Sequence, residues 1–226
     1  MNAALIAGQN EFSRSFNEAL AEKPNAAWRA AGRKTKAEPN GEDGDWWLRN
    51  GPGMVDAYYR WRMANPDLVI WTTPAGTPAI ELEVNISLSD GTMVKGFIDR
   101  IFQDFGTSEL LIVDLKTGKR KPAPIQLAVY NLAILHTFGV TAKYGAYWMA
   151  RDGTLDTVHD LERLPPKMVS RWFRDVNQAR QAGIFVPHVS MNCDWCGMKP
   201  HCYVHTDNTF QPDFDSDLIH MAEGSN

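Results

Sequence analysis

Apolar and polar residues alternate from Ala79 to Leu88, a pattern typical of a strand with one buried face. Asp90-Gly91 then predicts a hairpin turn, and a second strand is expected from about Met93 to Phe102. A third strand, Leu110 to Lys116, is apolar over most of its length, so we expect it to be central and buried. The middle of the chain is therefore predicted to form a β-sheet.

Helical periodicity precedes these strands. Residues 1–30 repeat apolar side chains at helical spacing, and so do residues from Met54 to Met63. Asn65-Pro66 is expected to end the second helix, because proline cannot continue a helix and disfavours the helical conformation of the residue before it. Residues 31–45 are polar and contain glycine and proline, which is typical of a loop.

Further elements follow the third strand. Pro122 and Pro124 are placed to begin a helix, and Gly139 is placed to end it. The elements expected here are a helix from Ile125 to about Thr137, strands over Lys143–Ala150 and Thr154–His159, and a helix from Pro165 to near Gly183.

This order of elements predicts an α/β (α+β) fold in which a mixed central sheet is flanked by helices. We expect a single domain over residues 1–206, with a helical part at 1–66, a central part at 67–185 and a cysteine segment at 186–206. Residues 207–226 carry several acidic side chains without periodicity, so they are predicted to form a disordered tail.

Composition narrows the class of protein. The chain has 226 residues, of which 44% are hydrophobic, and its formal net charge is −4. No apolar run approaches the roughly 20 residues that span a membrane, and residues 1–10 lack the features of a secretory signal, so we expect a cytoplasmic protein without a membrane partner. The net charge argues against coating of nucleic acid by bulk positive charge, but it allows local basic clusters.

Acidic and basic residues lie on the second and third predicted strands. Asp99 lies in GFIDRI, and Asp114 and Lys116 lie in IVDLKTGK. Residues two apart on a strand point to the same face, so Asp114 and Lys116 are expected to lie side by side. Carboxylates can hold a divalent cation that activates water, and an ammonium group can steady a charged transition state. For a bare D-x-K, however, an ion pair at a strand end is the favoured interpretation, because the tripeptide is common.

The motifs in order are more specific than any one of them. G-x-x-D ends at Asp99, D-x-K-T-G contains Asp114 and Lys116, and Q-x-x-x-Y places Gln126 and Tyr130 on one face of the following helix. This pattern resembles the PD-(D/E)XK nuclease superfamily, in particular its RecB-like branch, which includes the exonucleases of CRISPR adaptation and many phage proteins. The resemblance covers roughly residues 50–205.

The resemblance implies a restriction-endonuclease-like fold, DNA as the substrate, and magnesium or manganese as the cofactor. It implies that Asp99 and Asp114 ligate the metal together with the backbone carbonyl of Leu115, and that Lys116 is the catalytic lysine. Gln126 and Tyr130 are then expected to contact the DNA backbone or to orient the active site. The alternative for these last two is a polar pair on a surface helix.

One departure from the family pattern concerns an early helix. Members of this branch often carry a metal-binding histidine there, whereas residues 51–64 contain none. Asp56 lies on the matching helix and could substitute, because carboxylate oxygens suit magnesium or manganese. An exposed helical aspartate without a metal is the alternative.

Basic residues follow the catalytic motif. Lys119, Arg120 and Lys121 are expected to hold DNA phosphates, with an ordinary solvated surface as the alternative. A second basic cluster is formed by Arg29, Arg33, Lys34 and Lys36.

All three cysteines lie within ten residues, as Cys193, Cys196 and Cys202. Their C-x2-C-x5-C spacing allows them to share one metal centre. The resemblance implies an iron–sulfur cluster that ties this segment to a fourth cysteine near the N-terminus, but the chain has no fourth cysteine. A non-cysteine ligand to an iron–sulfur cluster, a zinc site completed by His188, His201 or His205, and three free thiols therefore remain open.

The resulting hypothesis is a metal-dependent DNA nuclease. We expect an exonuclease or a DNA-end-processing enzyme of phage or bacterial recombination, repair or CRISPR adaptation, with proteins of those systems as partners. If the protein is phage-encoded, it is expected in the host cytoplasm. The alternative is a module of the same fold that binds DNA or a partner protein with weak or no cleavage.

Overall fold

The computed structural model describes residues 3–22, 36, 41–119, 121–190, 193 and 196–206. Arg120, the cluster of Arg29, Arg33 and Lys34, and the acidic tail 207–226 lie outside this part, so the expectations for them remain predictions. The chain divides into two compact units, Met1–Asp175 and Val176–Asn226. The expectation of one domain over residues 1–206 also stays a prediction.

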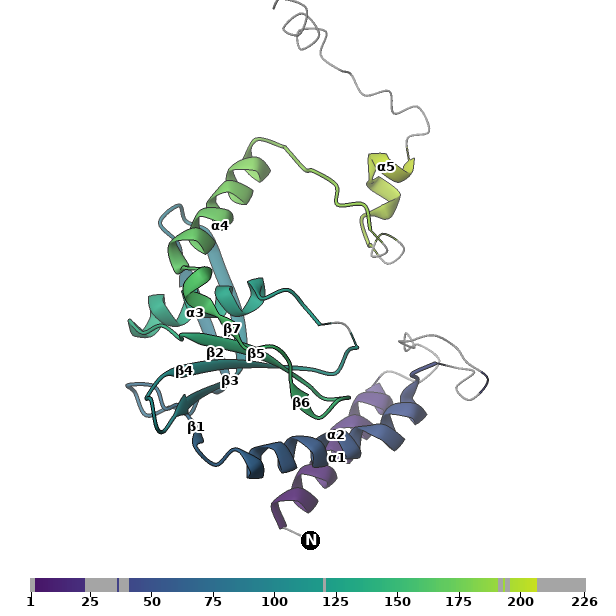
Figure 1. The fold of residues 1–226 in the computed structure, drawn as a ribbon. Coiled ribbons are helices and arrows are strands. Elements are labelled where there is room, and N and C mark those ends of the chain that lie inside the picture. Colours follow the sequence, from purple (N-terminus) through teal and green to yellow (C-terminus); the bar gives the residue numbers. More distant parts are fainter. Residues whose placement is uncertain are drawn as a thin grey trace, which may run out of the picture. The chain divides into compact units, whose positions relative to one another are not determined.

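A mixed sheet forms the centre of the first unit (Figure 1). Its strands are β1 (Leu68–Ile70), β2 (Ile80–Ser87), β3 (Met93–Asp104), β4 (Leu110–Lys116), β5 (Tyr144–Met149), β6 (Thr154–Leu155) and β7 (His159–Asp160). The order is β1-β3-β4-β5-β6, with β2 also paired to β3 and β7 to β5. β4 and β5 are parallel, whereas the other pairings are antiparallel. Parallel strands need a crossover, which here contains the helix α3 (Ile125–Phe138).

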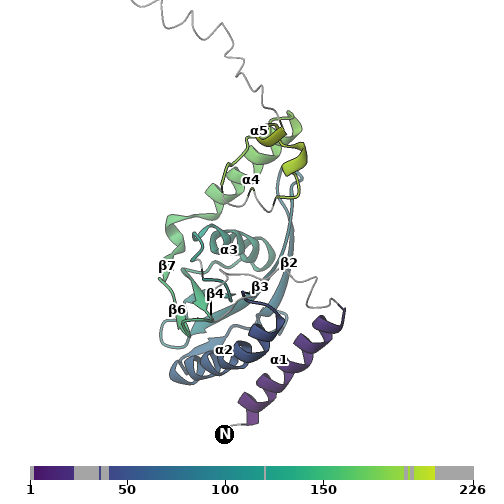
Figure 2. The ribbon, with the colours of Figure 1, turned by 90° about the vertical axis from the view of Figure 1, so that its right-hand side faces the viewer.

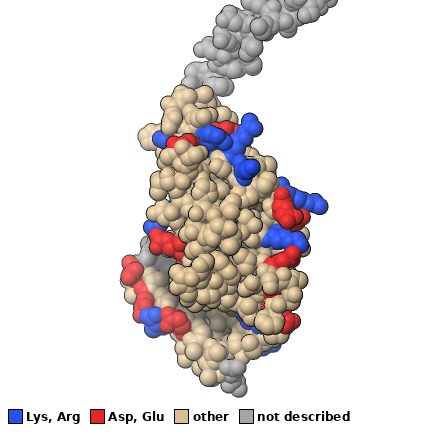
Figure 3. All heavy atoms as spheres, turned by 90° about the vertical axis from the view of Figure 1, so that its left-hand side faces the viewer, with Lys and Arg blue, Asp and Glu red and all other residues tan. Residues whose placement is uncertain are grey.

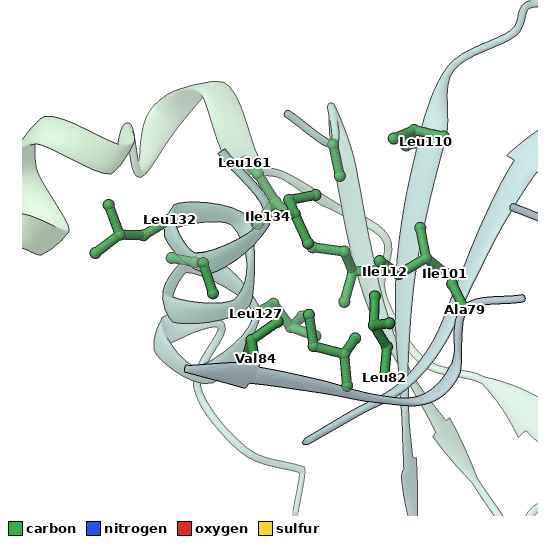
Figure 4. Packing of buried hydrophobic residues seen from close by; sticks show 14 of the residues in the cluster. Ala79, Leu82, Val84, Ile101, Leu110, Ile112, Leu127, Leu132, Ile134 and Leu161 are labelled. Carbon is green, nitrogen blue, oxygen red and sulfur yellow. The ribbon is translucent and has the colours of Figure 1, made fainter. Parts of the chain in front are cut away.

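Helices cover both faces of the sheet, as the two ribbon views show (Figures 1 and 2). α3 packs on one face, where Leu127 points toward Leu82, Ile112 and other buried side chains of the sheet (Figure 4). α2 (Gly44–Ala64) packs on the opposite face through Met54, Ala57, Tyr58 and Trp61. Each face of β4 therefore contributes to a different hydrophobic cluster, which explains why its sequence is almost continuously apolar.

The N-terminal helix α1 (Ala3–Glu22) packs along α2 (Figure 2). The contact is close because Gly51 has no side chain: a Cβ built there would lie 1.9 Å from the ring of Phe12. Gly51 and Pro52 both stand inside α2, where glycine and proline are otherwise unfavourable. At Gly51, the lack of a side chain permits the packing of the two helices.

Most of the predicted elements are confirmed. Asn65 caps the end of α2, and Gly139 ends α3 in the left-handed conformation, with φ of 72°. The stretch expected as a strand from Thr154 to His159 instead forms two short strands, β6 and β7, and between them Asp156 still donates its backbone N–H to the Tyr147 carbonyl at 2.8 Å. The three-residue strand β1 was not predicted, since so short a segment carries no measurable alternation.

The helix α4 (Pro166–Gln181) contains the point in the sequence where the two units divide, and it ends before Gly183. Its first half packs on the core through Val169, Trp172 and Phe173. The second unit contains the short helices η4 (Lys199–His201) and α5 (Tyr203–Thr206) in the cysteine segment.

Candidate active site

The candidate site lies where the pairing of β3 with β4 ends. The last pair joins Arg100 to Val113, so the next residues, Asp99 and Asp114, stand just beyond the ladder. There the Asp99 side chain replaces a strand partner, because its Oδ2 accepts a hydrogen bond of 2.7 Å from the backbone N–H of Leu115. Asp114 is only 2% exposed. The end of the ladder therefore brings the two predicted carboxylates together.

The helix α3 supplies the polar groups that face Asp114. Gln126 and Tyr130 lie one turn apart on the face of α3 that meets the sheet. Gln126 Nε2 donates to Asp114 Oδ1 at 2.9 Å and to Tyr130 Oη at 2.7 Å. Tyr130 Oη in turn donates to Asp114 Oδ1 at 3.3 Å. Both side chains therefore contact the Asp114 carboxylate, and their role in an active site stays a prediction.

Lys116 is held from three sides. Its Nζ lies 2.6 Å from Asp114 Oδ2 and donates to Gln126 Oε1 at 3.0 Å. The same atom lies 5.6 Å from the ring centre of Tyr147 on β5, close enough for a cation–π interaction. These contacts fix the direction of the ammonium group. The lysine side chain keeps 27% of its surface exposed, so a ligand can still reach it.

The electrostatics follow from burial. Burial raises the pKa of Asp114, the adjacent Lys116 ammonium opposes this shift, and the nearby charge of Asp99 adds to it. Burial also raises the pKa of Tyr130 to about 12, so its hydroxyl remains a donor at neutral pH. Burial likewise raises the pKa of Tyr147 to about 12, and its hydroxyl donates to the carbonyl oxygen of Ala123 at 2.8 Å.

The donor set fits a hard divalent cation. Asp114 Oδ2 is buried without a hydrogen-bond partner of acceptable geometry, although the Lys116 ammonium lies nearby. Within the described part of the chain, no group of three or more histidine, cysteine or acidic side chains converges on one point. Two carboxylates are nevertheless sufficient for magnesium, which usually retains several waters and binds substrate phosphates as well.

A distorted residue stands opposite Asp99. β2 pairs Ile80 with Arg100 and Leu82 with Ile98, so Glu81 faces Asp99 across the strands. The backbone of Glu81 has φ of 49°, which lies in the left-handed region that residues with a Cβ rarely adopt. Its carboxylate lies 3.2 Å from Arg100 Nη1, which also donates to the Asp99 carbonyl oxygen. The sequence shows Glu81 only as a polar strand residue and gives no sign of this conformation.

Asp56 lies on α2, on the other face of the sheet from α3. Its carboxylate forms an ion pair of 2.7 Å with Arg60, one turn along the helix. The structure does not gather Asp56 into a three-carboxylate group with Asp99 and Asp114. Its role as a metal ligand stays a prediction.

Lys119, Arg120 and Lys121, which follow β4, are called the basic loop. Both of its described lysines have acidic partners. Lys119 lies 3.2 Å from Glu42, and Lys121 pairs with Asp156. This second pair raises the pKa of Lys121 and lowers that of Asp156, mainly through the hydrogen bond between the two side chains. On the face drawn in Figure 3, basic and acidic side chains likewise lie next to one another around an uncharged middle. A phosphate therefore has to compete with carboxylates for these lysines.

The cysteine segment is built of short turns. Cys193 and Cys202 are half-buried, Cys196 is exposed, and none of the three forms a disulfide. The backbone N–H of Ser190 donates to Cys193 Sγ at 3.3 Å. The described residues of this segment, His201 and His205 included, form no metal-binding group of three or more ligands. The shared metal centre and its histidine candidates, His188 among them, stay predictions.

The comparisons with known proteins agree with this geometry. The chain belongs to the PD-(D/E)XK nuclease superfamily, whose sequence model matches residues 5–203. It is 34% identical over 194 residues to the Gene 69 protein of Mycobacterium phage D29, covering 76% of this chain and 70% of that protein. It is 30% identical over 200 residues to the Gene 69 protein of Mycobacterium phage L5, covering 71% and 68%. The mixed sheet flanked by helices is consistent with the restriction-endonuclease-like fold of this superfamily.

The helices that the structure describes were also compared with the dimensions of a bilayer. None of them combines the length and the apolar character that a membrane crossing requires.

Proposed function

We propose that this protein is a divalent-metal-dependent deoxyribonuclease that hydrolyses phosphodiester bonds. The observation that supports this most is the junction of β3, β4 and α3, where Asp99 and Asp114 stand beside Lys116. Gln126 joins Asp114 to Lys116 through one amide group. A structural ion pair at a strand end needs neither the second carboxylate nor the bridging amide.

Asp99 and Asp114 are the residues proposed to hold magnesium or manganese, with the Leu115 carbonyl as a further ligand. When bound there, the cation would lower the pKa of a coordinated water and offset charge on the phosphate. Lys116 directs its ammonium group at the attacking water or the phosphate, where it stabilises developing negative charge. Gln126 and Tyr130 fix Asp114 Oδ1, so that this carboxylate presents its other oxygen in a constant direction.

The finer assignment is an exonuclease or DNA-end-processing enzyme that acts in the host cytoplasm during phage recombination or repair. The matches to two mycobacteriophage proteins support a phage setting. Proteins of recombination or CRISPR adaptation are proposed as partners. We also propose that Cys193, Cys196 and Cys202 hold one metal centre, either an iron–sulfur cluster or zinc, with a structural role.

The proposal is tested by incubating the full chain with end-labelled linear DNA and with closed circular DNA, single- and double-stranded, in Mn²⁺, Mg²⁺ or EDTA. We expect cleavage of linear DNA in either metal and no cleavage in EDTA. Protection of the circles would identify an exonuclease. Binding of DNA without cleavage of any substrate would instead favour a binding module of the same fold.

A further inference from the structure

A second constellation lies directly behind the catalytic lysine. The strand β5 runs parallel to β4, and the residues after its end hold the chain that follows Lys116. The backbone N–H of Ala150 donates to the Lys116 carbonyl at 2.9 Å, and Arg151 Nε donates to the Thr117 carbonyl at 2.6 Å. Two successive carbonyls of the D-x-K-T-G motif are therefore fixed by two successive residues of another strand end.

The guanidinium of Arg151 is itself anchored. Its Nη1 and Nη2 donate to the two oxygens of Glu42 at 3.0 Å and 2.7 Å. The same group lies 4.7 Å from the ring centre of Trp46 and 5.5 Å from that of Trp47, at the start of α2. Arg151 and Glu42 are only 14% and 9% exposed. A planar, bidentate and stacked arginine is far more restricted in direction than a surface cation.

Glu42 holds a second cation of a different kind. Lys119 also pairs with Glu42, but its side chain is 72% exposed, and a single ammonium forms this contact. Exposed ion pairs are worth little and exchange readily, whereas breaking a buried one leaves a costly unpaired charge. A DNA phosphate can therefore take Lys119 from Glu42 while the pair of Arg151 with Glu42 stays intact.

We propose that Arg151, anchored by Glu42, is a positioning residue for the catalytic lysine. It acts through the Thr117 carbonyl, which it holds at the point where β4 ends, and so fixes the backbone from which Lys116 projects. Lys119 on the same loop can exchange Glu42 for a phosphate of the substrate. This inference rests on the proposed nuclease function. Arg151 and Glu42 are 109 positions apart in the sequence.

The test compares Arg151→Lys with Arg62→Lys. Arg62 offers a matched control, because it too donates to a backbone carbonyl, that of Leu68 at 2.6 Å, and stacks 4.5 Å from the ring centre of Phe102. It lies near the other end of α2, away from the site. Both substitutions keep the positive charge and remove the planar guanidinium with its paired N–H donors, so their effects on thermal stability should be similar.

Two readouts are measured on the full chain in Mn²⁺: the DNA cleavage constants, and the hydrogen exchange of the peptide covering residues 114–121. In Arg151→Lys we expect kcat to fall about 10- to 100-fold with KM changed less than about twofold, since the lysine is misplaced but the substrate contacts remain. Exchange in 114–121 should accelerate. Arg62→Lys should change neither quantity.

Glu42→Ala supplies a second variant. Combined with Arg151→Ala, it should cost little more than Arg151→Ala alone, because both act through one contact. The inference is overturned if Arg151→Lys leaves either kcat or the exchange of 114–121 no different from Arg62→Lys. If the wild-type protein cleaves no DNA, the proposed function fails, and the exchange measurement alone then decides whether Arg151 positions this segment.

Discussion

Gln126 provides a sharp test of the site, because one amide contacts both charged members of the catalytic motif. Its Nε2 donates to Asp114 and its Oε1 accepts from Lys116. Gln126→Ala removes both bonds and leaves Asp114, which is 2% exposed, with Tyr130 and Lys116 as its remaining contacts. The carboxylate and the ammonium, which already lie 2.6 Å apart, should then lose their fixed orientation toward the substrate.

The expected magnitude follows from the nature of these bonds. A hydrogen bond to a charged group contributes about 1.5–3 kcal/mol. If one such contribution is lost in the transition state, kcat falls about 10- to 150-fold, since about 1.4 kcal/mol corresponds to a factor of ten. The two bonds share one amide, so their contributions should not simply add.

Cleavage kinetics at saturating Mn²⁺ measure this loss, with thermal unfolding as a parallel record of stability. Asn131→Ala is the matched control. Asn131 is a buried amide on the same helix, but its Oδ1 accepts the backbone N–H of Ala142, away from the site. It should lower stability and leave kcat nearly unchanged. Equal kcat losses in the two variants would refute the assignment of Gln126 to the site.

Three further predictions concern the surface, the acid stability and the cysteines. Replacing Lys119 and Lys121 with alanine should weaken binding to all DNA sequences and make the salt dependence shallower by about one power of salt per lost phosphate contact; an unchanged slope would exclude both lysines from the interface. Hydrogen bonds from Thr107, first its backbone N–H, lower the pKa of Asp104, so this carboxylate stabilises the fold above about pH 4 and loses that effect as the pH falls. Asp104→Asn should therefore lower stability at pH 7 and flatten its decline below about pH 5 in urea titrations. Protein purified without oxygen should contain either iron with sulfide or stoichiometric zinc, and freely titrating thiols without either metal would contradict the shared centre.

Local periodicity was sufficient to predict which side chains of the candidate site share a face, whereas their roles came from the family resemblance and stay a proposal. A repeat of two placed Asp114 and Lys116 on one face, and a helical repeat placed Gln126 beside Tyr130. The resemblance to the nuclease superfamily then implied that Asp99 stands next to them, and the end of the β3–β4 ladder explains how. These relations depend on short stretches of sequence, which is why they were accessible without coordinates.

The supporting contacts depend on tertiary structure. Glu42 and Arg151 are remote in sequence and meet only because α2 packs across the sheet near the end of β5. The left-handed Glu81 is invisible in a pattern that alternates regularly through it. The lysines of the basic loop read as free charges in the sequence, yet each has a carboxylate partner that local patterns cannot supply.

The central claim is that Asp114 and Lys116 carry metal-dependent cleavage of DNA. The most direct measurement is single-turnover cleavage of labelled DNA in saturating Mn²⁺ by the wild-type chain, by Asp114→Ala and by Lys116→Ala, with Lys143→Ala as a control. Lys143 forms its ion pair with Glu109 at the opposite end of β4. We predict that each site variant loses at least about 100-fold in rate while remaining folded by circular dichroism, and that the control retains the wild-type rate. Cleavage at the wild-type rate by either folded site variant would contradict the account.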